Sequence, residues 1–242
     1  MDYSEKVADA VAHFWRTRLK QGESQGTTTG VRDTGGRRAV TGGAQLDGFI
    51  ELLASILEDA GLPQHTIHKK KKTALPGYFR PTKAWDLVVV VDGQLLASIE
   101  FKSHVGPSFG NNFNNRVEEA LGSAKDILTA YREGAFKPSQ KPWMGWLMLL
   151  EDAARSQKPT RVSEPHFKVL KQLKKASYAK RYELFCERLV RERLYDAACL
   201  ILSDRNEGMN GSYSEPNPEI SFRNFATSLR AHALAFVNMR EG

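Results

Sequence analysis

Residues 85–103 read WDLVVVVDGQLLASIEFKS and contain the clearest structural signal of the chain. Five consecutive apolar residues, Leu87 to Val91, predict a strand that is buried on both faces. Asp92 and Gly93 come next, and this pair favours the positive φ angles of a tight hairpin turn. A second strand is expected from Leu95 to Lys102. The stretch therefore predicts an antiparallel hairpin within a covered sheet.

Three charged side chains interrupt this apolar hairpin. Successive side chains of a strand point to opposite faces, so Glu100 and Lys102 share one face. If the hairpin brings Asp86 beside them, two carboxylates and an ammonium group converge. Mg²⁺ prefers carboxylate oxygens and keeps water and phosphate oxygens as further ligands. The pattern therefore predicts a Mg²⁺ site formed by the two acids and an exposed backbone carbonyl.

Phosphodiester hydrolysis is the chemistry that such a site favours. A bound metal lowers the pKa of a water molecule and neutralises charge on a phosphate. Lys102 would either orient the attacking water or, if burial lowers its pKa, accept a proton from it. The alternative is a solvated ion pair across two strands, which requires no metal. We favour the metal site because Asp86 opens an apolar strand.

The composition of the chain limits the classes of protein to which it can belong. The chain has 242 residues, 41% of them hydrophobic, and no low-complexity linker, which predicts a single domain over residues 1–242. The formal net charge of +7 favours an acidic partner. Cys186 and Cys199 are too few for a disulfide framework or a zinc cluster. No signal peptide and no membrane-spanning stretch are recognised, so a cytoplasmic protein without membrane contact is expected.

A segment rich in glycine, threonine and arginine, residues 22–43, shows no periodicity and predicts a flexible loop. It contains no Walker-type phosphate loop, so ATP is not expected as a cofactor. An amphipathic helix is expected from about residue 45 to 60, with Asp47 and Glu51 one turn apart on a shared face. Glu51 is a candidate outer metal ligand or water anchor beside Asp86. A solvated acidic edge is the alternative.

Two polar segments flank the predicted hairpin. Four consecutive lysines precede it and favour contact with a phosphate backbone, although such runs also occur in solvated loops. An asparagine-rich segment follows it and leads into a helix expected from about residue 114 to 131. Its amide and guanidinium groups can contact bases or phosphates, while a turn-rich helix entry is the alternative. The candidate DNA-binding residues are Lys69, Lys70, Lys71, Lys72, Asn111, Asn112, Asn114, Asn115 and Arg116.

The remaining patterns complete the expected fold. Helices are expected at residues 4–19 and 221–237, buried strands at 143–150 and 197–203, and basic helices between residues 155 and 181. The order is helix, hairpin, helix, strand, helices, strand, helix. This order predicts an α/β (α+β) fold in which a central mixed β-sheet is flanked by helices on both faces.

The same order of elements resembles the core of the PD-(D/E)xK nuclease superfamily. The hairpin carries Asp-x13-Glu-x-Lys, although Trp85 replaces the usual proline before the acid. Three longer stretches, residues 42–49, 78–83 and 99–112, resemble the XhoI family of type II restriction endonucleases. The resemblance extends over essentially the whole chain and implies a restriction-endonuclease-like core.

This resemblance implies a Mg²⁺-dependent homodimer that cuts double-stranded DNA at the palindrome CTCGAG and leaves 5′ overhangs. A cognate DNA methyltransferase would protect the same site in the host without direct contact. The superfamily pattern implies metal binding by Asp86, Glu100 and the backbone carbonyl of Phe101, with Lys102 at the nucleophilic water. Glu51 would correspond to the helix acid of some members. The alternatives are a repair or mobile-element nuclease and a non-catalytic DNA-binding protein.

Overall fold

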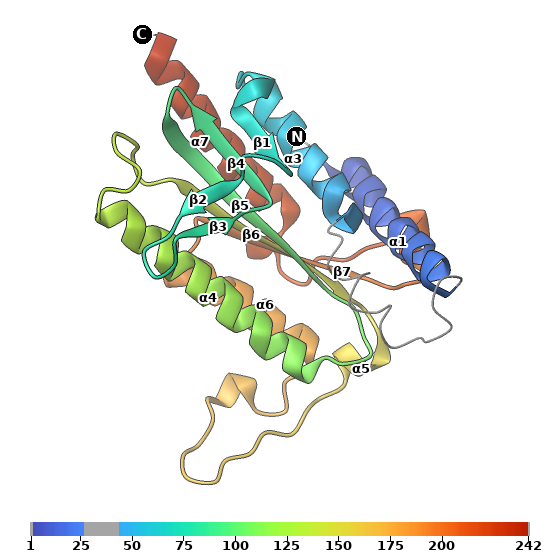
Figure 1. The fold of residues 1–242 in the computed structure, drawn as a ribbon. Coiled ribbons are helices and arrows are strands. Elements are labelled where there is room, and N and C mark those ends of the chain that lie inside the picture. Colours follow the sequence, from blue (N-terminus) through green and yellow to red (C-terminus); the bar gives the residue numbers. More distant parts are fainter. Residues whose placement is uncertain (1, 27–43, 242) are drawn as a thin grey trace.

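A five-stranded sheet forms the centre of the computed structural model, which describes residues 2–26 and 44–241. The strand order is β1–β4–β5–β6–β7 (Figure 1). The strands are β1 (Ile67–Lys69), β4 (Leu87–Val91), β5 (Gln94–His104), β6 (Trp143–Glu151) and β7 (Ala197–Ser203). The pairs β1–β4 and β4–β5 are antiparallel, whereas β5–β6 and β6–β7 are parallel. The predicted mixed sheet is therefore confirmed.

Helices cover both faces of this sheet, as the order of elements predicts. The helices on one face are α1 (Ser4–Gly26), α3 (Asp47–Asp59) and α7 (Phe222–Glu241). Those on the other face are α4 (Gly110–Arg132) and α6 (Tyr178–Arg191) (Figure 1). Each face has its own apolar core, with Ile99 and Phe101 of β5 in the first, and with Trp146 and Met148 of β6, the partners of Glu100 and Lys102, in the second. Alternation along β5 therefore directs Glu100 and Lys102 toward the α4 and α6 side.

A small second sheet joins β1 to β4 along the chain. Its antiparallel strands are β2 (Ala74–Pro76) and β3 (Thr82–Ala84). The other short elements are η1 (Ala44–Leu46), η2 (Gln64–Thr66), α5 (Ala154–Gln157), η3 (Lys171–Leu173), η4 (Glu207–Asn210) and η5 (Pro218–Ile220). The predicted turn of the central hairpin is confirmed, since Asp92 and Gly93 have φ angles of 47° and 76°. This turn lets β4 lead directly into β5.

Three predicted segments differ clearly from the structure. α1 continues to Gly26, so residues 22–26 of the predicted loop are helical, and residues 27–43 lie outside the described part of the chain. Gln21 and Glu23 are good helix formers and offset the cost of Gly22. α4 begins at Gly110, so the asparagine-rich segment lies within its first turns. The basic helices expected between residues 155 and 181 are instead mostly irregular, because prolines interrupt that segment.

The two cysteines behave as core residues. Cys186 and Cys199 are free and buried, and burial raises the pKa of both thiols. A thiol in such surroundings is chemically inert. In the part of the chain that the structure describes, no helix combines the length and the apolar character needed to cross a membrane.

Candidate active site

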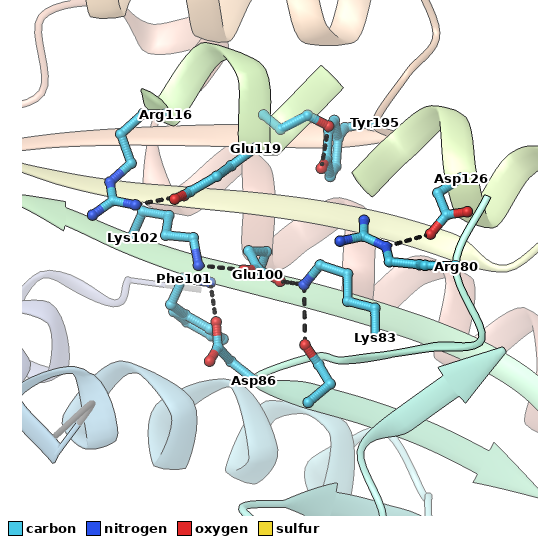
Figure 2. Close-up of polar contacts among 12 residues, drawn as sticks. Arg80, Lys83, Asp86, Glu100, Phe101, Lys102, Arg116, Glu119, Asp126 and Tyr195 are labelled. Carbon is cyan, nitrogen blue, oxygen red and sulfur yellow. Dashed lines mark hydrogen bonds and ion pairs between the residues drawn. The ribbon is translucent and has the colours of Figure 1, made fainter. Parts of the chain in front are cut away.

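The register of the central hairpin places Asp86 opposite Glu100. Leu87 pairs with Ile99 across β4 and β5, so the next pair outward is Asp86 with Glu100. Side chains of directly opposed residues lie on the same face of an antiparallel pair. The Asp86 N–H donates to the carbonyl oxygen of Ile99 at 3.2 Å, and its Oδ2 accepts the Phe101 N–H at 2.7 Å (Figure 2). The hairpin thus brings the two carboxylates together.

Glu100 is the centre of a charged cluster. Its side chain is only 6% exposed and forms two ion pairs, with Oε1 facing Lys102 Nζ and Oε2 lying 2.5 Å from Lys83 Nζ. Lys102 comes from the same strand, as the alternation predicts, whereas Lys83 comes from β3 (Figure 2). Two carboxylates and two ammonium groups therefore meet at one end of the sheet.

The cluster changes the proton affinity of its members. Burial and the charge of Glu100 raise the pKa of Asp86 to about 6. Burial opposes the charged form of Lys102, but the attraction of Glu100 and Asp86 outweighs it and raises the pKa of that ammonium group. Lys102 is therefore a cation, which supports the role of orienting water and does not support the alternative in which burial lowers its pKa.

The raised pKa of Asp86 makes the stability of the metal-free protein depend on pH. Protonated Asp86 stabilises the fold below its ordinary pKa of 3.8, and this contribution is lost as the pH rises through about 6. Relative to Asp86→Asn, the free energy of unfolding of the wild type is expected to fall by roughly 2 kcal/mol between pH 4 and pH 7. Urea unfolding between pH 4 and pH 7 in EDTA measures this difference. Parallel pH curves for the two proteins would contradict the assignment.

The other two predicted metal-site residues differ in their positions. Phe101 is buried between Glu100 and Lys102 on β5, and its N–H is held by Asp86. Glu51 instead lies on α3, with a 58% exposed side chain 2.5 Å from Lys69 Nζ. No group of three acidic, histidine or cysteine side chains within residues 2–26 and 44–241 could hold a metal ion. Glu51 is not brought to the two carboxylates, because α3 packs on the opposite face of the sheet.

The lysine run begins at the end of β1. Lys69 pairs with Glu51, and Lys70 Nζ lies 2.7 Å from Asp47 Oδ2. The side chains of residues 71 and 72, both lysines, are exposed. The run therefore divides into two lysines with acidic partners on α3 and two that present their charge to solvent.

The predicted asparagines lie in the first two turns of α4. Asn112 Nδ2 donates to the carbonyl oxygen of Ser108 at 2.9 Å, and Arg116 forms an ion pair with Glu119. The exposed asparagines are Asn111, Asn114 and Asn115. Asn112 and Arg116 thus have structural partners within α4 and its entry, while the other three present free edges to solvent.

Lys83 is the member of the cluster that sequence reasoning did not single out. Its Nζ also donates to the carbonyl oxygen of Ala84 at 3.0 Å and lies 4.4 Å from the centre of the Trp85 ring. The ring face attracts a cation. Two sequence signals were available: Lys83 precedes Asp86 by three residues, and Trp85 stands where the superfamily pattern has proline.

Asp126 of α4 fixes the tip of the hairpin that carries Lys83. Its Oδ1 accepts the N–H groups of Tyr78 and Phe79 at 2.7 and 2.8 Å, and its Oδ2 accepts Arg80 Nε at 2.6 Å. The Asp126 side chain is buried, and these donors hold the pKa of its carboxyl below the ordinary value even though burial opposes this. The β2–β3 hairpin is thereby anchored to α4 (Figure 2).

Asp126→Ala is expected to lower the free energy of unfolding by about 2–4 kcal/mol, because three donors lose a charged acceptor. The amides of Tyr78 and Phe79 should also exchange hydrogen faster than in the wild type. Urea unfolding and native-state hydrogen exchange measure the two effects. Asp59→Ala, at an exposed position of α3, is the matched control. Wild-type protection of both amides in Asp126→Ala would contradict the anchoring role.

Comparisons with known proteins identify the family of this chain. A family model described as restriction endonuclease XhoI matches residues 25–215. The type II restriction enzyme BstVI of Geobacillus stearothermophilus is 54% identical over 206 residues, which cover 83% of this chain and 92% of the relative. AbrI of Azospirillum brasilense, another type II restriction enzyme, is 50% identical over 168 residues, or 69% and 75% of the two chains.

The type II restriction enzyme XhoI of Xanthomonas vasicola is 44% identical over 192 residues, covering 78% of this chain and 76% of the relative. No solved structure matches significantly. The region matched by the family model includes the whole charged cluster, from Lys83 to Lys102, and also Asp126, which anchors the β2–β3 hairpin to α4. The chain therefore belongs to the XhoI family of type II restriction endonucleases, which are site-specific deoxyribonucleases.

Proposed function

We propose that this enzyme hydrolyses double-stranded DNA at the palindrome CTCGAG in a Mg²⁺-dependent reaction and leaves 5′ overhangs. The observation that carries the chemistry is the convergence of Asp86, Glu100 and Lys102 on one face of the hairpin. Type II restriction endonucleases act on DNA and generally use a divalent metal. The recognition sequence rests on the resemblance to the XhoI family.

The donor set fits Mg²⁺. Asp86 and Glu100 supply carboxylate oxygens, and the backbone carbonyl of Phe101 is the third proposed ligand. All three are hard oxygen donors, and so small a set leaves positions for water and for phosphate oxygens. A bound Mg²⁺ would lower the pKa of a water molecule and neutralise charge on the phosphate.

The protein groups position the reaction. Lys102, held as a cation by Glu100, would orient the nucleophilic water and stabilise the negative charge that develops on the phosphate. In-line attack of water on phosphorus breaks the bond to the 3′ oxygen. The water loses a proton and the leaving oxygen gains one, which yields a 5′-phosphate and a 3′-hydroxyl. Glu51, which is ion-paired on α3 at the other face of the sheet, takes no part in the proposed step.

The proposed assembly follows from the symmetry of the DNA. A palindromic site mirrors a twofold axis, so two copies of this single-domain chain would each cut one strand. A cognate DNA methyltransferase would modify the same site without contacting the enzyme. The exposed groups proposed to contact DNA are Lys71, Lys72, Asn111, Asn114 and Asn115. Lys69, Lys70, Asn112 and Arg116 would have to exchange a present partner for DNA.

Two plasmids that differ by one base pair test the proposal. One carries a single CTCGAG, and in the other that sequence is altered at one position. We expect Mg²⁺ to permit linearisation of the first plasmid alone, EDTA to prevent it, and sequenced ends to show 5′ overhangs. Cutting at a different sequence would overturn the site assignment. Smeared or structure-dependent nicks, or binding without cleavage in Mg²⁺, would overturn the proposed reaction.

A further inference from the structure

We propose that Lys83 is a built-in competitor of the divalent metal. Its ammonium group forms an ion pair with Glu100 in the metal-free protein, and it moves to a phosphate of the DNA when the metal binds. This inference rests on the proposed metal site at Asp86 and Glu100. It makes metal binding and DNA binding favour each other.

Both oxygens of Glu100 already have a cation. Oε1 faces Lys102, and Oε2 lies 2.5 Å from Lys83 Nζ (Figure 2). The side chains of Lys83 and Glu100 are 14% and 6% exposed, so solvent ions screen this pair less than a surface pair. A divalent metal that binds the same carboxylate must therefore approach a nearby positive charge.

The net charge of the cluster also disfavours binding of a divalent metal to the metal-free protein. When all four groups are ionised, Lys83 and Lys102 cancel the charges of Asp86 and Glu100. A cluster without net charge attracts a divalent cation weakly. Removing only the charge of Lys83 leaves one net negative charge for the metal.

Of the two lysines paired with Glu100, Lys83 is the one that can move away from it. Lys102 is fixed two residues from Glu100 on the same strand, whereas Lys83 extends from the separate β2–β3 hairpin. The Ala84 carbonyl and the buried Trp85 ring hold its ammonium group beside the site independently of Glu100. A phosphate that enters the site replaces Glu100 as the anionic partner of Lys83. Each ligand therefore relieves a cost of binding the other, and this coupling is reciprocal.

The test is the affinity for Mn²⁺ without DNA, measured from the electron paramagnetic resonance signal of free Mn²⁺. Lys83→Met keeps the apolar stem against Trp85 and removes the charge, and it is expected to bind Mn²⁺ about tenfold more tightly than the wild type. Lys141→Met is the matched control, since Lys141 pairs with Asp196 and not with the cluster, and its affinity should not change. If Lys83→Met does not fold, Lys83→Gln removes the same charge.

The coupling is tested with a duplex whose scissile 3′ oxygen is replaced by a methylene group, which prevents cleavage. This duplex should tighten Mn²⁺ binding to the wild type more than binding to Lys83→Met. Unchanged or weaker Mn²⁺ affinity in a folded Lys83 variant, beside a wild type that binds Mn²⁺, would overturn this inference alone. A wild type that binds no Mn²⁺ with or without the duplex would overturn the proposed metal site as well.

Discussion

Glu100→Gln is expected to lower the single-turnover rate of DNA cleavage by about 10³-fold or more, which corresponds to roughly 4 kcal/mol. The amide has nearly the shape of the carboxylate but is a poor ligand for a hard cation. The substitution also removes the charge that attracts both Lys83 and Lys102. Rapid-quench measurements with Mg²⁺ and excess enzyme give the rate of the chemical step.

The affinity for DNA distinguishes a loss of catalysis in Glu100→Gln from a general loss of folding or DNA binding. In EDTA, Glu100→Gln should bind the duplex at least as tightly as the wild type, because a negative charge near the phosphates has been removed. Glu133→Gln, at the exposed end of α4, is the matched control and should cut at the wild-type rate. Cleavage by folded Glu100→Gln within a few-fold of the wild type would contradict the role of Glu100.

Lys102→Met is expected to lower the rate of the chemical step by about 10²- to 10³-fold, the usual range for removing one charged or donor group that stabilises a transition state. The methionine keeps the length of the side chain but cannot orient water or balance developing charge. Single-turnover cleavage in saturating Mg²⁺ measures the loss. Lys102→Arg keeps the charge with a different geometry and should recover only part of the rate.

The two lysines of the cluster should differ in how their loss is observed. Lys83→Met should change the affinity for the metal. Lys102→Met should instead lower the rate even at saturating Mg²⁺, because Lys102 acts on the reaction itself. Lys141→Met serves again as the surface control. A Lys102→Met enzyme that cuts at the wild-type rate would contradict the proposed mechanism, whatever its affinity for Mg²⁺.

The central hairpin could be predicted from sequence because its signals are local. Alternation along the strand places Glu100 and Lys102 on one face, and Asp92-Gly93 marks the turn. The register shift between Val89 and Val90, which sets Asp86 opposite Glu100, has no such signal in the sequence. The buried strands β6 and β7 were recognised from continuous apolar runs, which are typical of parallel strands covered on both faces.

The parts that sequence did not predict depend on long-range contacts. Lys83 joins the site only because the small β2–β3 hairpin folds over β5, held by Asp126 from 46 residues beyond Arg80. The three-residue strands of that hairpin are too short for a periodic signal. The placement of Glu51 depended on which face of the sheet α3 covers, and spacing within one helix contains no information about that choice.

The most direct test of a shared metal site at Asp86 and Glu100 is a double-mutant cycle on Mn²⁺ affinity, measured in the presence of the uncleavable duplex. We expect Asp86→Asn and Glu100→Gln each to weaken Mn²⁺ binding by at least about tenfold, and the double variant to be little weaker than either single variant, because ligands of one ion are strongly coupled. Wild-type affinity in both single variants, or strictly additive losses, would contradict a single metal site at this hairpin.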